Sequence, residues 1–290
     1  MKPASFAYHD PTSLEEVLAL LAEAGDDGRV LAGGQSLVPL LNFRMARPSV
    51  LVDLNRCAEL DYVRHEGDEI AIGAMTRQWD AEHSDVVAKH CPLLPAGLFY
   101  MGHAAIRNRG TVGGSLAHAD PGAELLTIAM AMNAGIVLQS ANGKRRLTPD
   151  EFFLDSLVTA IEPGEILVEA RFPVHRPGQR TAFVESGVRR ADLAIAGIAA
   201  HVDVDPSGTC TAAQFVALGG GTRPTPLPSV AAALTGRNER DLSFEDAIDA
   251  CNDDIDPPSD LQASADYRRK LLAALTRRAL EQLFPAGRHA

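Results

Sequence analysis

Two glycine-rich stretches, Ala32-Gly33-Gly34-Gln35-Ser36-Leu37 and Gly110-Thr111-Val112-Gly113-Gly114-Ser115-Leu116, are the part of the sequence that decides the fold. Each adjoins an apolar segment and combines glycines with hydroxyl-bearing residues. Glycine lets the backbone approach a ligand closely and adopt positive φ. Successive backbone N–H groups in such turns form a concavity that binds anions. Either stretch alone favours an ordinary tight turn over a ligand site, so the rest of the sequence has to decide between the two interpretations.

The overall charge restricts which ligands these stretches could serve. The chain has 290 residues, 27 of them Lys or Arg and 38 Asp or Glu, which gives a net charge of −11. This balance argues against a nucleic-acid partner, because phosphate backbones are bound by clustered Lys and Arg. A bound phosphate would have to be met locally. Two glycine-rich turns could hold a pyrophosphate from both sides without a lysine.

The composition is that of a globular protein with about two domains. Hydrophobic residues make up 46 % of the chain and charged residues 22 %. The four cysteines are scattered and form no C-x-x-C, so the usual spacing of an iron–sulfur or zinc-ribbon site is missing. We expect a reducing, cytoplasmic location. The N-terminus lacks the apolar core of a signal peptide, and the longest apolar stretch, 125–138, is too short to span a membrane.

Hydrophobic periodicity predicts a mixed first half. A capping box at Ser13–Glu16 predicts a helix that Gly25 ends, and Asn142-Gly143 predicts a hairpin with a type I′ turn. Further helices are expected in pieces over 77–101, broken at Pro92 and Pro95, and as a buried helix over 123–132. Strands are expected at 29–32, 50–54, 69–74, 135–139, 144–147 and 165–172.

The second half is expected to be a small antiparallel sheet backed by helices, an α+β layer domain. A linker at 175–178 precedes it. Strand-like runs follow at 180–185, 194–204 and 213–218, with a turn at 205–208 between two of them. The tail at 264–284 carries leucines on one helical stripe.

Other chemistry finds less support in the sequence. There is no G-x-G-x-x-G that opens a helix, no Walker A motif, no H-E-x-x-H and no G-x-S-x-G. The segment Arg107-Asn108-Arg109 is either a phosphate clamp or a solvated loop beside a turn. Asp120 and Glu124 are either a paired-carboxylate acid/base site or caps of a helix that begins near Pro121.

Both stretches, in this order and with their flanks, resemble the FAD-binding medium subunit of molybdenum hydroxylases. Carbon monoxide dehydrogenase, nicotine dehydrogenase and bacterial xanthine dehydrogenase have such subunits. The resemblance covers nearly the whole chain. It is carried by 32–41 with Arg44 and Pro48, by 72–76, by 106–121, by Glu165-Ile166-Leu167, by 189–192 and by 264–268.

The resemblance implies an α+β fold of two domains with FAD bound non-covalently between them. Residues 1–176 would form an FAD-binding domain of the vanillyl-alcohol-oxidase/PCMH type, with two α+β subdomains at about 1–57 and 58–176. Residues 177–290 would form a C-terminal α+β domain of the medium-subunit type. Segments 32–36 and 111–115 would hold the diphosphate, largely through backbone N–H groups. The residues implied to contact FAD are Ala32, Gly33, Gly34, Gln35, Ser36, Leu37, Thr111, Val112, Gly113, Gly114, Ser115, Asp120, Glu124, Ile161, Glu185 and Leu193.

Four positions depart from the family pattern. Residue 35 is Gln where many relatives have His, and residue 124 is Glu where Asp is common. Residue 193 is Leu where relatives often place Tyr or Phe beside the flavin, and residue 185 is Glu where carbon monoxide dehydrogenases have Lys. A lysine near a flavin stabilises the reduced anion, so its absence would favour a lower potential. These departures leave the electron acceptor open.

The implied function is an electron-transferring flavoprotein subunit. It would receive electrons from a partner [2Fe–2S] subunit, fed by a large molybdopterin subunit, and pass them to an external acceptor. The expected assembly is a dimer of heterotrimers, without nucleic acid or a transmembrane segment. A stand-alone FAD-dependent oxidase or reductase and a non-redox nucleotide-binding module are the alternatives. Gly33→Val and Gly113→Val are expected to occlude the diphosphate cradle.

Overall fold

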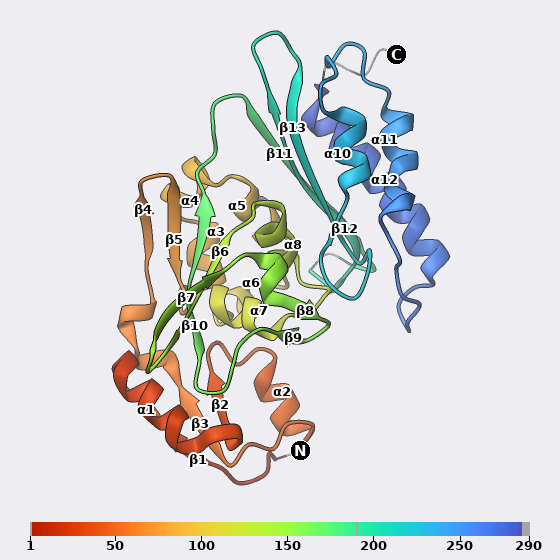
Figure 1. Cartoon of the computed structure of the whole chain (residues 1–290). Coiled ribbons are helices and arrows are strands. Elements are labelled where there is room, and N and C mark those ends of the chain that lie inside the picture. The colour runs from red at the N-terminus through yellow and green to blue at the C-terminus, as the bar shows by residue number, and fades with distance from the viewer. Residues whose placement is uncertain (1, 190, 286–290) are drawn as a thin grey trace.

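The computed structural model describes residues 2–189 and 191–285 (Figure 1). The N-terminal elements lie at one end of the molecule and the helices of the C-terminal part at the other. Three main sheets succeed one another along the chain, and the α+β class expected from the sequence is confirmed. Within the described residues, no helix combines the length and apolar character needed to cross a membrane.

The first sheet is parallel, with strand order β1-β3-β2. At its first helix, Ser13 Oγ accepts a hydrogen bond from Glu16 N, but the Glu16 carboxylate accepts from Thr12 N. The expected capping box is therefore only half formed, while Gly25 ends the helix at φ 56° as predicted. The elements are β1 (Ala7–His9), α1 (Leu14–Ala24), η1 (Gly25–Asp27), β2 (Gly28–Leu31), α2 (Leu37–Asn42) and β3 (Val50–Asp53).

The second sheet is antiparallel, with strand order β4-β5-β10-β6-β7. The predicted hairpin forms, but Ser140 pairs with Gly143, so the turn residues are Ala141 and Asn142, one position earlier than expected. Gly143 takes up the positive φ, at 132°. The elements are η2 (Leu54–Arg56), η3 (Ala58–Leu60), β4 (Val63–Glu66), β5 (Glu69–Gly73), β6 (Gly135–Ser140), β7 (Gly143–Leu147) and β10 (Ile166–Pro173).

Short helices cover one face of this second sheet. Pro95 lies inside the first turn of α5, where a missing N–H is tolerated, so only Pro92 separates helices as predicted. All eight residues of α8 are buried, as expected for an Ala- and Leu-rich core helix. The elements are α3 (Gln78–Glu82), α4 (Asp85–His90), α5 (Leu93–Leu98), α6 (Ala104–Arg107), α7 (Val112–His118), α8 (Glu124–Ala131), α9 (Pro149–Phe152), β8 (Phe153–Asp155) and β9 (Val158–Thr159).

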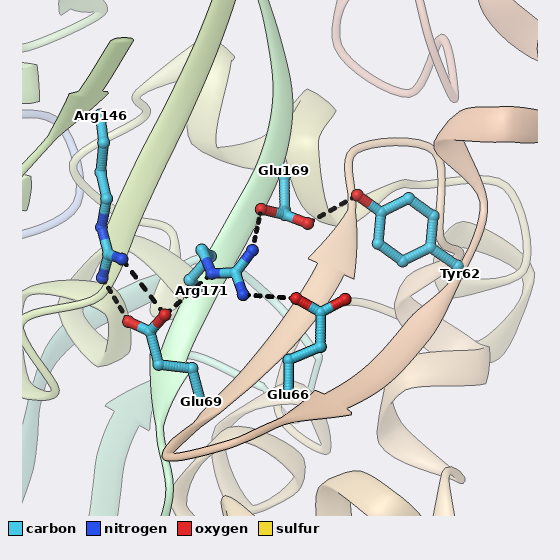
Figure 2. A network of polar contacts seen from close by, with 6 residues as sticks. All are labelled: Tyr62, Glu66, Glu69, Arg146, Glu169 and Arg171. Carbon is cyan, nitrogen blue, oxygen red and sulfur yellow. Dashed lines mark hydrogen bonds and ion pairs between the residues drawn. The ribbon is translucent and has the colours of Figure 1, made fainter. Parts of the chain in front are cut away.

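Strands of the second sheet are joined by a polar network (Figure 2). The Arg171 guanidinium contacts three carboxylates: Glu66 at 2.6 Å, Glu69 at 2.9 Å and Glu169 at 2.8 Å. Arg146 pairs with Glu69 as well, and Tyr62 donates to Glu169 at 2.7 Å. The two arginines hold the pKa of the Glu69 carboxyl below its usual range. Clustered acidic side chains on this sheet are thus compensated by clustered cations.

The third sheet is antiparallel, with order β11-β12-β13-β14, as the sequence predicted for the second half. One face packs on α10, α11 and α12, and its other face contributes Phe183, Ala199 and Val216 to the core around α5 and α8. The elements are β11 (Gln179–Gly187), β12 (Ala194–Val204), β13 (Cys210–Leu218), β14 (Thr225–Pro226), α10 (Pro228–Leu234), α11 (Phe244–Ala250), η4 (Cys251–Asp253) and α12 (Ala265–Leu283).

Candidate functional site

A cavity of about 740 Å³ lies where the first sheet, the helices of the middle part and the β11–β12 loop meet. Twelve of the sixteen residues expected to contact a ligand line it, from both glycine-rich segments and from the start of α8. They are Ala32, Gly33, Gly34, Gln35, Ser36, Leu37, Thr111, Gly114, Ser115, Asp120, Glu124 and Leu193. The fold therefore brings together segments that are far apart in the chain.

The first glycine-rich segment connects β2 to α2 along the cavity wall. Gly34 has a φ of 74°, which glycine adopts without steric cost. Among the described residues, the backbone N–H groups of Gly33 to Leu37 have no protein acceptor. Ser36 makes no side-chain capping bond at the start of α2. Five successive free N–H groups beside a cavity are the donor set that an anionic group such as a diphosphate requires.

The second segment differs, because its N–H groups are already used by the protein. Val112 N donates to Thr76 O at 3.0 Å, and Gly113 N donates to Ala74 O at 2.9 Å. Gly114 N donates to the Thr111 hydroxyl at 3.0 Å. The segment is also the start of α7, with Thr111 as its N-cap, rather than a free turn. The N–H groups of Val112 to Gly114 thus have protein acceptors in this structure, and their expected role toward a diphosphate stays a prediction.

The glycines of the two segments make close contacts with the protein itself. A Cβ added to Gly33 would lie 2.2 Å from the Arg109 carbonyl oxygen. A Cβ added to Gly113 would lie 2.4 Å from Ala74 Cβ. Gly33→Val and Gly113→Val would therefore disturb the packing of the protein before they occluded a cradle. This clash adds a second reason for their effect, and the occlusion of a diphosphate cradle stays a prediction.

Polar side chains hold the two segments together. Asn55 Nδ2 donates to Ala32 O at 3.0 Å, and Arg77 donates to Asn55 Oδ1 at 2.7 Å. The same Arg77 donates to Arg109 O at 2.6 Å. This bridge fixes the first segment relative to the residues that precede the second one.

Four expected residues do not line the larger cavity. Gly113 and Ile161 line a smaller one of about 280 Å³, between α1, β2 and the 161–167 segment. The two cavities share Arg29, Val30, Ala32, Gly114 and Ala117, so they are neighbours around the first glycine-rich segment. The other two expected residues, Val112 and Glu185, line neither cavity. Val112 is fully buried, and Glu185 lies on β11.

The end of the larger cavity at α8 carries unusual acidic groups. Glu124 is only 4 % exposed, and burial together with nearby Glu185 raises its pKa. Asp120 Oδ1 accepts from Gly122 N at 2.9 Å, and the helix begins at Glu124, not near Pro121, so the predicted capping role is wrong. Leu193 is 53 % exposed and lines the same cavity.

Arg107 fits neither interpretation offered by the sequence. It is 8 % exposed, pairs with Glu82 at 2.7 Å and donates to the Met101 and Gly102 carbonyl oxygens. The residue therefore supports the loop before α6 rather than clamping a phosphate or lying in solvent.

Sequence reasoning missed several residues that line the cavity. Gln78 is the most informative, because its buried Oε1 has no hydrogen-bond partner among the described residues. No motif marks it, since it reaches the cavity only through the packing of α3 beside Gly110. The other missed lining residues are Arg29, Val30, Leu40, Met101, Gly102, Ile106, Ala117, His118 and Leu157.

Comparisons with known proteins agree with this geometry. Residues 4–175 match the model of the FAD binding domain in molybdopterin dehydrogenase, and 181–283 match the carbon monoxide dehydrogenase flavoprotein C-terminal domain. The chain is 39 % identical to the 6-hydroxypseudooxynicotine dehydrogenase complex subunit alpha of Paenarthrobacter nicotinovorans, over 99 % of this chain and 97 % of that protein. It is 36 % identical to the carbon monoxide dehydrogenase medium chain of Hydrogenophaga pseudoflava, over 97 % of each.

A solved structure supports the same assignment. A carbon monoxide dehydrogenase from Hydrogenophaga pseudoflava that lacks the Mo-pyranopterin moiety superimposes with a TM-score of 0.94 at 34 % identity, over 98 % of this chain and 99 % of that one. The row of free N–H groups beside the cavity fits the FAD that the matched domain binds. The chain therefore belongs to the FAD-binding medium subunits of the molybdenum hydroxylases, a family of oxidoreductases.

Proposed function

We propose that this chain binds FAD non-covalently and carries electrons from a [2Fe–2S] partner subunit to an external acceptor. The observation that carries the proposal is the Gly33 to Leu37 segment, whose five unpaired N–H groups lie beside the larger cavity. A dinucleotide with a central diphosphate suits this position, because the larger cavity lies along the segment and the smaller one is reached at Ala32, immediately before it. Once bound, FAD supplies the redox chemistry, and the chain supplies binding, orientation and electrostatics.

The proposed placement of FAD follows from the two cavities. The smaller one, which Ile161 lines, would take the adenosine end, and the larger one would take the flavin end toward Leu193. Segment 33–37 would donate to the diphosphate, and Glu124 would line the flavin half. The division into domains at 176/177 is part of the same proposal. It is supported by the change from the second sheet to the third around this point.

The partners are proposed from the chemistry that this chain lacks. Within the described residues, no group of three or more His, Cys, Asp or Glu side chains could hold a metal ion. The iron–sulfur clusters and molybdopterin would therefore belong to a small and a large partner subunit, in a dimer of heterotrimers in the cytoplasm. The relative from Paenarthrobacter nicotinovorans is itself named as a subunit of a dehydrogenase complex.

The binding proposal can be tested with the purified chain and two flavins. FAD should bind with one molecule per chain and give a flavin absorption spectrum. FMN lacks the diphosphate and the adenosine. Its dissociation constant should be at least roughly hundredfold higher than that of FAD, since each hydrogen bond to a charged group contributes about 1.5–3 kcal/mol. Equilibrium dialysis measures both. Equal affinities, or a protein that FAD leaves colourless, would contradict the proposal.

The electron-transfer proposal needs the partner chains. Co-expression should yield a stable complex, and anaerobic addition of the organic substrate should bleach the flavin absorbance of that complex. A flavin that stays oxidised while the iron–sulfur centres are reduced would favour a non-redox nucleotide-binding module. Turnover by the isolated chain would favour a stand-alone oxidase or reductase.

A further inference from the structure

Two carboxyl groups meet at the α8 end of the larger cavity. Glu124 is the first residue of α8 and lines the cavity, whereas Glu185 comes from β11 in the third sheet and does not line it. The two carboxyl groups lie within hydrogen-bonding reach of each other. A hydrogen bond between two carboxyl groups requires a proton on one of them, because an ionised carboxylate only accepts.

The surroundings of the pair supply no compensating cation. Among the described residues, no Lys, Arg or His forms an ion pair with either side chain, and the other charged group that faces Glu124 is the carboxylate of Asp120. One oxygen of Glu185, Oε2, is buried and has no hydrogen-bond partner in the part of the chain that the structure describes. Glu66, Glu69 and Glu169 are compensated by Arg171 instead (Figure 2). Two carboxylates in contact, one buried and one half-buried, with no cation beside them, cannot both stay ionised near neutral pH.

We propose that Glu185 is a positioning residue that keeps Glu124 protonated, so that the pair holds one shared proton and Glu124 presents an uncharged oxygen to the cavity. The inference rests on the proposed FAD site, because the ligand of that cavity is the group affected. Protonated Glu124 donates to the Glu185 carboxylate and keeps its other oxygen as an acceptor for a hydroxyl donor of the ligand. Loss of the proton places a second negative charge beside an anionic dinucleotide and repels it.

The direction of the pKa values agrees with this arrangement. Burial raises the pKa of both carboxyls above the usual range for Glu. Glu124 is the more deeply buried of the two and also faces the Asp120 carboxylate, so we assign the shared proton to Glu124. Because the raised pKa belongs to the folded state, the contribution of this pair to the free energy of unfolding is fully present below the usual pKa of Glu and is lost as the pH rises through the raised pKa.

The first experiment needs no bound FAD. The infrared spectrum of the apoprotein should contain a protonated carboxyl C=O band near neutral pH that disappears on titration to about pH 9. Glu124→Gln should remove this band, and Glu185→Gln should move its loss to lower pH, because an amide donor at position 185 favours ionised Glu124. Glu23→Gln, at an exposed position on α1, is the matched control and should leave the band unchanged. A wild-type spectrum without the band, or a band that survives in Glu124→Gln, overturns the proposal.

The second experiment measures FAD affinity against pH. The FAD dissociation constant of the wild type should rise up to about tenfold per pH unit above the pKa of the pair, which is the limit for one linked proton. Glu124→Gln should flatten this rise while the protein still binds FAD, and Glu23→Gln should retain it. FAD affinity that is independent of pH in the wild type overturns the linkage even though the FAD site itself stands. Absence of FAD binding at every pH is the separate failure of the proposed function.

Discussion

The two glycine-rich segments look alike in sequence but differ in what their backbones do. Segment 33–37 leaves its N–H groups free beside a cavity, whereas Val112, Gly113 and Gly114 donate theirs to protein oxygens. In both segments a glycine lets the backbone lie close to another group, but that group differs between the two segments. Gly33 packs on the Arg109 carbonyl, and Gly113 packs on Ala74. A Gly-Gly pair therefore marks a close backbone approach, and only the hydrogen bonds of the neighbours show whether the partner is a ligand or the protein.

This difference suggests a division of labour between the segments. The second segment anchors α7 to the turn at 74–76, which follows β5. The first segment packs against it at Gly33 and at Gly114, since a Cβ added to Gly114 would lie 3.2 Å from Ala32 Cβ. The first segment would then bind the anion, and the second segment would fix the conformation of the first. Four substitutions test this division, in order of decreasing expected effect.

Gly113→Val should have the largest effect, and the effect should be on folding. The new side chain would overlap Ala74 Cβ, Cα and O, at 2.4, 2.6 and 2.8 Å from the Cβ position alone. Because backbone has to move, we expect a loss of at least about 3 kcal/mol in the free energy of unfolding. Urea denaturation of the apoprotein measures it. A variant with wild-type stability that loses only FAD would instead assign the second segment to the ligand.

Thr111→Val and Ser36→Ala form a matched pair, since each removes one hydroxyl from one segment. Thr111 is 1 % exposed and accepts from Gly114 N, so its replacement should cost about 1–2 kcal/mol of stability. Its FAD affinity should stay within about threefold. Ser36→Ala removes no capping bond, so its stability should stay within about 0.5 kcal/mol. We expect its FAD dissociation constant to rise roughly tenfold.

Thermal unfolding of the apoprotein and FAD titration separate these outcomes. If Thr111→Val weakened FAD binding more than Ser36→Ala while keeping its stability, the roles of the two segments would be reversed. If both variants changed the stability and the FAD affinity equally, the two segments would not have different roles.

The sequence predicted most of the elements because their signals are local. The apolar run of α8 and the alternation along β10 each depend on residues within one element. Helix α2 was not predicted, since it has six residues and contains Pro39. Helix α7 was taken for a turn because Gly113 and Gly114 lower helix propensity, which the Thr111 cap and two bonds to distant carbonyls offset here.

The sequence predicted which segments form the site, but not which residues interact with one another within it. The resemblance named residues on both sides of the cavity, and twelve of them line it. The acceptors Ala74 O and Thr76 O, and the contact of Glu124 with Glu185, join segments distant in the chain. Such contacts depend on tertiary packing, and no local sequence pattern predicts them.

Arg77→Met should have the smallest effect and tests whether the two segments act as a unit. The substitution removes the bonds from Arg77 to Asn55 Oδ1 and Arg109 O, which lie in an exposed region, so the stability loss should be about 1 kcal/mol or less. Since Asn55 then loses its anchor to Ala32 O, the first segment should become more mobile. FAD affinity should fall by roughly threefold, through ordering entropy rather than a lost contact.

Hydrogen exchange of the Gly33 to Leu37 amides measures this loosening directly, and Arg240→Met, an exposed arginine in the C-terminal part, controls for the lost charge. Faster exchange in Arg77→Met alone would mean that the second segment shapes the first through this bridge. Unchanged exchange would mean that the contact of Gly33 with the Arg109 carbonyl holds the first segment without help. Backbone packing alone would then keep the first segment in its conformation, and the side-chain bridge of Arg77 and Asn55 would not contribute to it.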